Sequence, residues 1–128
     1  MGLECINVDP AVAAPGGHYS HAVRANGFVF VSGQLPIAPD GTRLGDAPFE
    51  VQAAQVLENV RQVLLGCGCD VADLVQVRVY LDDLAHWPAF NTLYARWAGA
   101  ARPARAVVPS GALHHGLKIE IEAVAAAR

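Results

Sequence analysis

Residues 27–34, with the sequence GFVFVSGQ, place the strongest constraint on how this 128-residue chain can fold. Aromatic and β-branched residues predominate here, which predicts a β-strand. Because side chains alternate along a strand, Phe28 and Phe30 lie on one face, and Val29 and Val31 lie on the other. A strand with two apolar faces must be covered twice, by helices on one side and by something else on the other. In so short a chain, another subunit is a candidate for the second cover.

Two segments have the periodicity of amphipathic helices. In residues 48–65, apolar residues recur at three- and four-residue steps along one face: they are Ala53, Val56, Leu57, Val60, Val63 and Leu64. Residues 87–98 form the second predicted helix, with a buried stripe of Phe90, Leu93, Tyr94 and Trp97. Pro88 is well placed for the first turn of this second helix.

The other predicted strands are residues 3–8, 74–81, 104–108 and 117–125. In residues 74–81 the alternation puts Val75, Val77, Val79 and Leu81 on one face. The element order is ββ-α-β-α-ββ with an early extra strand, which favours a sheet with both helices packed on one face. We find no internal repeat or linker, so residues 1–128 are predicted to form a single domain.

The composition narrows the class of partners. Hydrophobic residues make up 53% of the chain and charged residues only 16%, which indicates apolar surface buried against other subunits. The net charge is −3 and the nine basic residues are scattered, so nucleic acid is a poor candidate partner. The sequence has no signal pattern and no apolar run of membrane-spanning length, so no membrane partner is expected. Three cysteines, an odd number, favour a reducing cytoplasm over a disulfide framework.

One arginine and one glutamate, fifteen positions apart, are the candidates for chemistry. Arg105 lies in a strand-like segment of small and β-branched residues, and its planar guanidinium suits a carboxylate. Glu120 lies on the polar face of an alternating strand, together with Lys118 and Glu122. A cation for an acidic substrate and a carboxylate that holds a water would make a hydrolytic pair. An internal ion pair between Arg105 and Glu120 explains the same spacing equally well.

The chain resembles the RidA/YjgF family of reactive-intermediate deaminases. The resemblance rests on Tyr19-Ser20, Ser32-Gly33-Gln34, the Arg105 segment and Ile119-Glu120-Ile121-Glu122-Ala123, in this order, and it extends from about Ala14 to the C-terminus. It implies a chorismate-mutase-like α+β fold, an α/β sandwich with one mixed sheet and two helices on one face. It also implies a homotrimer with three clefts at the subunit interfaces.

The resemblance also implies a role for each matching residue. Arg105 would hold the substrate carboxylate, and Glu120 would position the hydrolytic water. Tyr19 would line the cleft. The other positions implied to bind substrate are Ser32, Gly33, Asn91, Val107 and His114. Some relatives carry a cysteine at the position of Val107, so any role of that thiol is absent here.

The histidines replace residues that are usual in the family. His18, His21 and the pair His114-His115 lie in loops expected near the cleft mouth, so substrate choice is affected more than reaction class. These imidazoles could bind a metal, tune substrate choice or be ordinary loop residues. No helical spacing of ligands supports a metal, and no metal is expected.

The implied reaction converts a 2-aminoacrylate-type enamine, through its imine, into a 2-oxo acid and ammonia. It needs no cofactor, and its partner would be a small carboxylate-bearing imine or enamine. Two alternatives remain open at this point. One is a pathway-dedicated deaminase of a larger, aminomuconate-like enamine acid, and the other is a non-catalytic trimer that binds a small ligand. The family has also been labelled as ribonucleases, which an acidic chain without a basic stripe does not favour.

Overall fold

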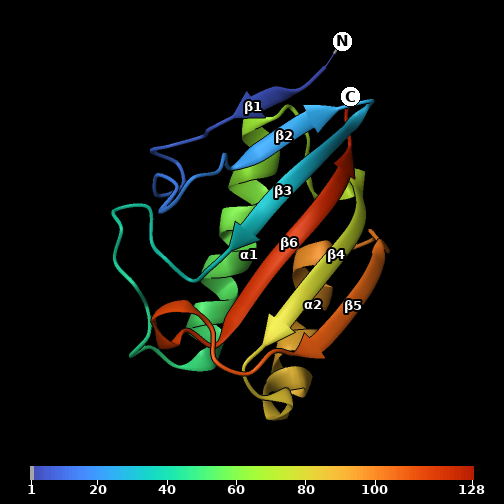
Figure 1. Cartoon of the computed structure of the whole chain (residues 1–128). Helices are drawn as coiled ribbons and strands as arrows, with labels where there is room; N and C mark the ends of the chain where they lie inside the picture. Colours follow the sequence, from blue (N-terminus) through green and yellow to red (C-terminus); the bar gives the residue numbers. More distant parts are fainter. Residues whose placement is uncertain (1) are drawn as a thin grey trace.

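The computed structural model describes residues 2–128 as one six-stranded sheet with two helices behind it (Figure 1). The strands are β1 (Glu4–Ile6), β2 (Ala22–Ala25), β3 (Phe28–Gln34), β4 (Leu74–Leu81), β5 (Ala104–Pro109) and β6 (Ile119–Ala126), and the helices are α1 (Phe49–Gly66) and α2 (Trp87–Ala98). The strand order is β1-β2-β3-β6-β4-β5. Only β4 and β5 pair in parallel, so the predicted mixed α+β sheet with both helices on one face is confirmed. The predicted domain also includes Met1, which lies outside the described residues.

Strand β2 is not among the strands that the sequence pattern predicts. It forms an antiparallel hairpin with β3, and Ala25 pairs with Phe28 across a two-residue turn. The turn residues Asn26 and Gly27 both have positive φ angles, 51° and 82°. Asn-Gly is the preferred pair for such a type I′ turn, so the signal for this hairpin was present in the sequence.

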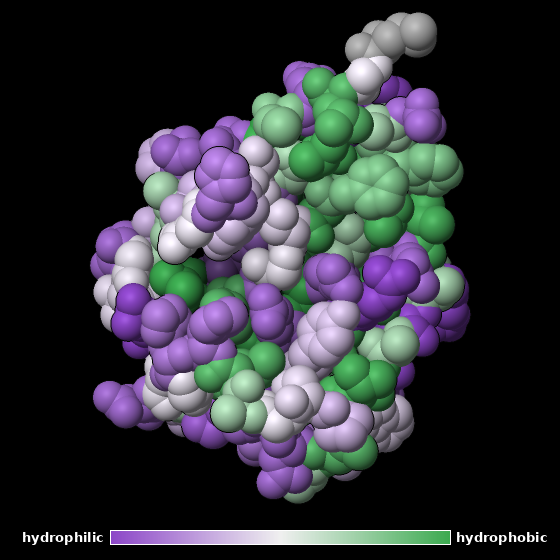
Figure 2. Space-filling model, in the orientation of Figure 1, coloured by the Kyte–Doolittle hydropathy of each residue, from purple (hydrophilic) through white to green (hydrophobic). Residues whose placement is uncertain are grey.

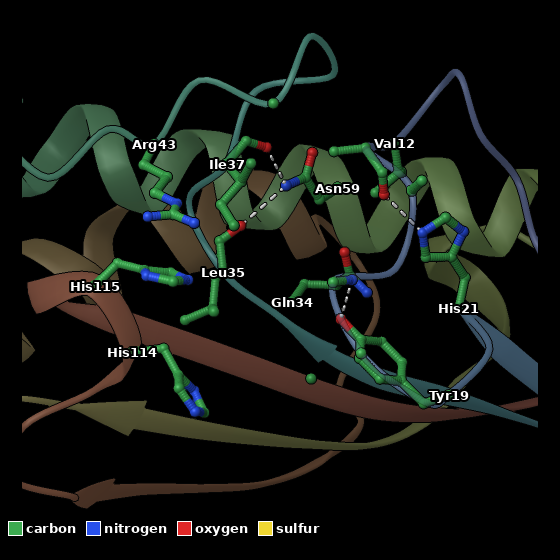
Figure 3. A pocket seen from close by; sticks show the side chains of 16 residues that line it. Val12, Tyr19, His21, Gln34, Leu35, Ile37, Arg43, Asn59, His114 and His115 are labelled. Carbon is green, nitrogen blue, oxygen red and sulfur yellow. Dashed lines mark hydrogen bonds between the residues drawn. The ribbon is translucent and has the colours of Figure 1, made fainter.

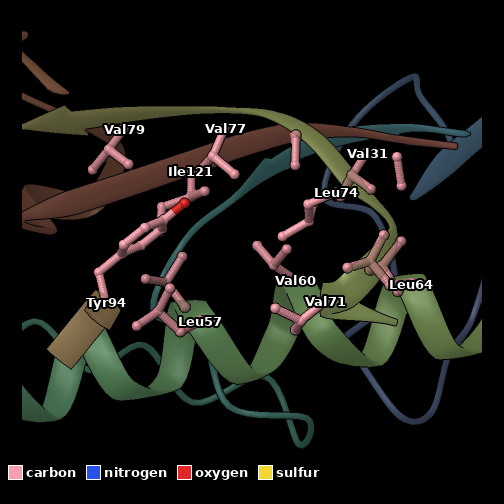
Figure 4. Close-up of a cluster of buried hydrophobic side chains, with 14 of the residues drawn as sticks. Val31, Leu57, Val60, Leu64, Val71, Leu74, Val77, Val79, Tyr94 and Ile121 are labelled. Atoms are coloured by element: carbon pink, nitrogen blue, oxygen red, sulfur yellow. The ribbon is translucent and has the colours of Figure 1, made fainter. Parts of the chain in front are cut away.

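The core lies between the sheet and the helices (Figure 4). All six apolar residues predicted on one face of α1 are buried, as are Phe90 and Tyr94 of α2. Leu93 and Trp97 are half-buried and pack against the edge of this core. From the sheet, Val77, Val79 and Ile121 point toward the helices and are fully buried.

The prediction that Val75 lies on the buried face of β4 is wrong. Val75 is 43% exposed, and Leu74 is buried in its place. Between Leu74 and Gln76, β4 advances two residues while β6 advances one, from Ala125 to Val124. This extra residue is a β-bulge, which reverses the alternation before it.

The face of the sheet opposite the helices is uncovered in the single chain. Phe28 and Phe30 of β3 lie on this open face and are 41% and 46% exposed. Figure 2 views the open face and shows apolar side chains gathered over β1 to β3, next to a more polar area over β4 and β6. The second apolar face predicted from the sequence therefore exists, and nothing within residues 2–128 covers it. Neither α1 nor α2 has the combination of length and apolar character needed to span a bilayer.

Candidate functional site

A cavity of about 460 Å³ opens beside the sheet, at the end where β3 finishes. Its walls come from the loop before β2, the loop between β3 and α1, and the turn before β6, which lie together at the left of Figure 1. Three of the predicted site residues line it: Tyr19, Gly33 and His114. Figure 3 shows the lining side chains from close by. The structure thus brings part of the predicted site together in one chain.

A bulge in β3 places Gly33 against Glu120. Between Val31 and Gln34, β3 advances three residues while β6 advances two, from Ala123 to Ile121. A Cβ added to Gly33 would overlap Oε2 of Glu120. Glycine is therefore needed here for the close approach of the carboxylate to the β3 backbone.

The surroundings of Glu120 favour its protonated form. Burial is the largest cause that raises the pKa of this carboxyl, and the nearby Glu122 raises it further, whereas His114 lowers it. A carboxylate with a raised pKa holds a proton more firmly and so is a better general base once it is ionised. The environment of Glu120 suits proton transfer at the edge of this cavity.

Tyr19 and Ser32 make different contacts in the single chain. The Tyr19 side chain is half-exposed, and its hydroxyl accepts a hydrogen bond from the Gly16 N–H at 3.3 Å. The Ser32 hydroxyl donates to the Ser20 carbonyl at 2.6 Å, and the Ser32 N–H donates to the His21 carbonyl at 2.9 Å. Ser32 therefore fixes the loop that carries Tyr19, and it does not line the cavity.

Among the histidines, His21 is structural. It is 2% exposed, its Nδ1 accepts from the Val8 N–H at 2.9 Å, and its Nε2 lies 2.8 Å from the Ala13 carbonyl oxygen. Both ring nitrogens thus hold the loop before β2. His114 and His115 line the cavity, whereas His18 is exposed and does not. Within residues 2–128, no three His, Cys, Asp or Glu side chains gather closely enough to hold a metal ion.

Arg105 lies in a second group of residues, on the opposite side of the sheet. Its Nη1 donates to Oδ1 of Asn91 at 3.0 Å, and its guanidinium carbon lies 4.8 Å from the centre of the Tyr94 ring. We call Arg105, Asn91 and Tyr94 the arginine group. The predicted Val107, two residues further along β5, is half-buried against the core. Arg105 itself is exposed in the single chain, so its charge is free to meet an anion.

Strand pairing shows that Arg105 and Glu120 do not meet in one chain. On β4, Arg105 pairs with Val77 and Glu120 pairs with Tyr80. Side chains three positions apart on a strand point to opposite faces, and Val77 faces the helices. No ion pair joins Arg105 to Glu120 in the part of the chain that the structure describes, so the internal ion pair allowed by the sequence is excluded.

Glu122 is already engaged on the open face. Its Oε1 accepts a hydrogen bond from the Tyr80 hydroxyl at 2.5 Å and lies 3.6 Å from Nη1 of Arg78. The hydrogen bond to Glu122 is the largest cause that raises the pKa of Tyr80. These contacts give Glu122 a structural role on the open face.

The sequence pattern did not identify several residues of the cavity and of the arginine group as site residues. The pattern correctly predicts Tyr94 in the buried stripe of α2, but it does not predict the contact with Arg105. Tyr94 lies three positions after Asn91, a spacing that puts both on one helix face. Arg43 and Asn59 line the cavity from the loop after β3 and from α1. No local signal marks Arg43, because only the folded loop directs it to the cavity.

The chain matches known proteins over nearly its full length. The sequence model for the family described as Endoribonuclease L-PSP matches residues 10–127. The Arabidopsis thaliana protein named Reactive Intermediate Deaminase A, chloroplastic, is 37% identical over 122 residues, which cover 95% of this chain and 65% of that protein.

Solved structures show the same fold. The YjgF gene product of E. coli superposes with a TM-score of 0.88 at 31% identity, over 98% of this chain and 99% of that one. E. coli TdcF, solved with bound serine, superposes with a TM-score of 0.90 at 29% identity, over 98% of this chain and all (100%) of that one. These likenesses confirm the fold that the sequence resemblance implied.

Proposed function

The chain belongs to the RidA/YjgF family, and we propose that it hydrolyses 2-aminoacrylate-type enamines and imines to 2-oxo acids and ammonia. The observation that carries the proposal is the Glu120 carboxylate, held against Gly33 beside a cavity in surroundings that raise its pKa. The relative named Reactive Intermediate Deaminase A supports the reaction class.

Arg105 binds the substrate carboxylate. A guanidinium offers two parallel N–H donors to a carboxylate, and the Asn91 amide and the Tyr94 ring fix the orientation of this fork. With its carboxylate held in this way, the imine presents its electrophilic carbon in one orientation, which lowers the entropic cost of attack.

Glu120 acts as the general base. A water bound to its carboxylate loses a proton to Oε as its oxygen forms a bond to the imine carbon, and the nitrogen takes up a proton to give a carbinolamine. The carbinolamine hydroxyl then gives its proton to the Glu120 carboxylate, which passes a proton to the nitrogen as the C–N bond breaks, so that ammonia and a 2-oxo acid leave. The Gly33 backbone and the Tyr19 ring form the wall beside the reacting carbon.

The complete site requires two copies of the chain. Since Arg105 and Glu120 lie on opposite faces of one sheet, a substrate that touches both must lie between subunits. The exposed Phe28 and Phe30 on the open face support an assembly that buries this face. A homotrimer with a cleft at each subunit interface, as in the sequence-based prediction, satisfies both conditions.

A non-catalytic ligand-binding role is the second candidate. It is favoured by the structure of TdcF with bound serine, an amino acid whose carboxylate an arginine would also hold. Catalysis explains one feature that binding alone does not, because a ligand-binding site has no use for a carboxylate with a raised pKa next to an acidic ligand. A ribonuclease activity is opposed by the net charge of −3.

A coupled assay tests the proposal. An amino-acid oxidase generates imines, semicarbazide traps the surviving imine, and faster loss of trapped product measures deaminase activity. We expect acceleration by the wild type and its loss in Arg105→Ala. Arg96→Ala is the matched control, because Arg96 is an exposed arginine on α2 outside both groups. No acceleration with any imine, from a correctly assembled protein, would contradict the proposed reaction.

A cytoplasmic location remains part of the proposal. It is supported by the three free cysteines, two of which, Cys67 and Cys69, are buried thiols. Relatives include proteins named as chloroplastic and as mitochondrial, so cell fractionation is the appropriate test.

A further inference from the structure

The cavity beside the sheet has more cationic groups than the proposed reaction on a small imine uses. Its ionisable lining side chains are Tyr19, His21, Arg43, His114 and His115, and none of the lining residues is an aspartate or glutamate. Both ring nitrogens of His21 are already engaged by the backbone. The permanent positive charge of the lining is therefore that of Arg43, and the two neighbouring histidines add ring nitrogens that can form hydrogen bonds.

Arg43 has no anionic partner of its own. Arg24, Arg61 and Arg78 each lie within ion-pair distance of a glutamate or aspartate, whereas Arg43 forms no ion pair within residues 2–128. A guanidinium cannot lose its charge, and one that lines a cavity without a partner attracts an anion from solution.

The packing of its loop fixes the backbone of Arg43, whereas the Arg43 side chain is exposed. Its backbone forms a β-bridge with Ile37, and the amide of the buried Asn59 donates to the carbonyls of Leu35 and Ile37 at 3.1 and 2.9 Å. The same loop contacts the turn before β6, where a Cβ added to Gly45 would lie 3.7 Å from the His115 carbonyl oxygen.

These contacts bring Arg43 and the histidine pair to the same end of the cavity. In Figure 3 the Arg43 and His115 side chains extend to the end opposite Tyr19, and His114 lies below them. We call Arg43, His114 and His115 the distal cationic subsite. A volume of about 460 Å³ exceeds what a three-carbon enamine needs, and it falls in the range of sites that enclose larger ligands.

We propose that the distal cationic subsite binds a second acidic group of the substrate, so that the preferred substrates are imines of amino acids whose side chain ends in a carboxylate. The proposal rests on the proposed function and specifies its substrate class. In this arrangement Arg105 of one subunit holds the α-carboxylate, Glu120 of another holds the water, and Arg43 receives the side-chain carboxylate through its two N–H donors.

The kinetic test compares two imines of similar length, made by oxidation of glutamate and of methionine. We expect wild-type kcat/KM to be higher for the acidic imine. Arg43→Gln should lower kcat/KM for the acidic imine about 10- to 100-fold, the usual effect of losing a hydrogen-bonded charge, and leave the neutral imine within about twofold. The neutral imine thus reports whether the variant is folded, and Arg96→Gln is the charge-matched control.

A binding test separates this proposal from the proposed function. Calorimetric titration with 2-oxoglutarate and with 2-oxopentanoate measures the preference for a second carboxylate without turnover, and we expect that preference to disappear in Arg43→Gln. If imines are hydrolysed but Arg43→Gln changes neither the kinetic nor the binding preference, the subsite is refuted and deamination stands. If no imine is hydrolysed but the binding preference depends on Arg43, the subsite stands and the reaction is refuted.

Discussion

Two residues, Gly33 and Glu120, determine each other's environment. The bulge in β3 turns the Gly33 backbone toward β6, and the missing side chain makes room for the carboxylate. Partial burial beside this backbone then raises the pKa of Glu120. The chemistry of the proposed base therefore depends on a neighbour that has no functional group.

Replacing the carboxylate separates catalysis from stability. Glu120→Gln should lower kcat at least about 100-fold, because the amide cannot accept the proton of the attacking water. A carboxyl whose folded-state pKa is raised loses its stabilising contribution as pH rises through that pKa. Thermal unfolding at pH 7 should therefore show the variant to be at least as stable as the wild type, with a smaller difference in acid. Full activity in Glu120→Gln would rule out the assigned base.

The close approach of Gly33 can be tested with one methyl group. Gly33→Ala should push the Glu120 carboxylate away from the β3 backbone and reduce kcat/KM about 10- to 100-fold, since a shift of about 1 Å in a catalytic group has effects of this size. Gly27→Ala is an unsuitable control because Gly27 has a positive φ of 82°. Gly45→Ala is suitable, since Gly45 does not line the cavity and a Cβ there would make only ordinary contacts, at 3.7 and 3.8 Å. Unchanged kinetics in Gly33→Ala would show that the contact has no catalytic role.

At the scale of elements, α1 supports the cavity as well as the core. The buried amides of Gln52 and Asn59 donate to carbonyls of the loop that follows β3: Asn59 to Leu35 and Ile37, and Gln52 to Ala47. The side-chain oxygen Oε1 of Gln52 in turn accepts a hydrogen bond from the Lys118 N–H at 3.0 Å, next to the start of β6. One helix thus anchors two of the three segments that form the cavity.

Removing one of these amides should loosen that wall. Asn59→Leu leaves the Ile37 carbonyl without a donor and the Leu35 carbonyl with only the Ile37 N–H, so the free energy of unfolding should fall by about 1–3 kcal/mol. Urea denaturation measures this loss, and amide hydrogen exchange should increase in residues 35–47. Gln62→Leu is the control, because the Gln62 amide bonds only to the exposed Glu58. Equal stability of Asn59→Leu and Gln62→Leu would contradict the anchoring role.

The sequence predicts helices and strands correctly wherever the pattern that marks them lies within the segment itself. Periodicity identified α1 and α2 because their apolar faces repeat every three to four residues over several turns. Which β4 side chains face the core was harder to predict, because the bulge at Val75 depends on the pairing of β4 with β6. Within the site, Arg105 and Glu120 were predictable as candidates. Their separation by the sheet was not, because it depends on the registers of β4 with β5 and β6.

At the scale of the whole molecule, the open face of the sheet is the surface that leaves large apolar side chains exposed to solvent. Its apolar part over β1 to β3 includes Phe28 and Phe30, and its polar part over β4 and β6 includes Arg78, Tyr80 and Glu122. A group of exposed apolar side chains on one face of a sheet indicates a surface that packs against another layer. The proposed trimer would both cover this face and complete the site.

A single charge on the open face should disrupt that assembly. Phe30→Glu places a carboxylate where the proposed interface is apolar, so sedimentation or native mass measurement should show loss of the oligomer, and deaminase activity should be lost with it. Val51→Glu is matched in exposure, 48% against 46%, and lies on α1 away from the sheet, so it should leave the assembly intact. An intact, active oligomer of Phe30→Glu would place the interface elsewhere.

The shared site is the central claim, and subunit mixing tests it directly. Arg105→Ala and Glu120→Gln, each inactive alone, are refolded together in equal amounts. In a mixed trimer, one cleft combines Arg105 from one variant with Glu120 from the other. Random mixing should therefore restore about a quarter of wild-type activity. Activity no higher than that of the separate variants, in trimers shown by mass to be mixed, would mean that both residues of each site belong to one chain.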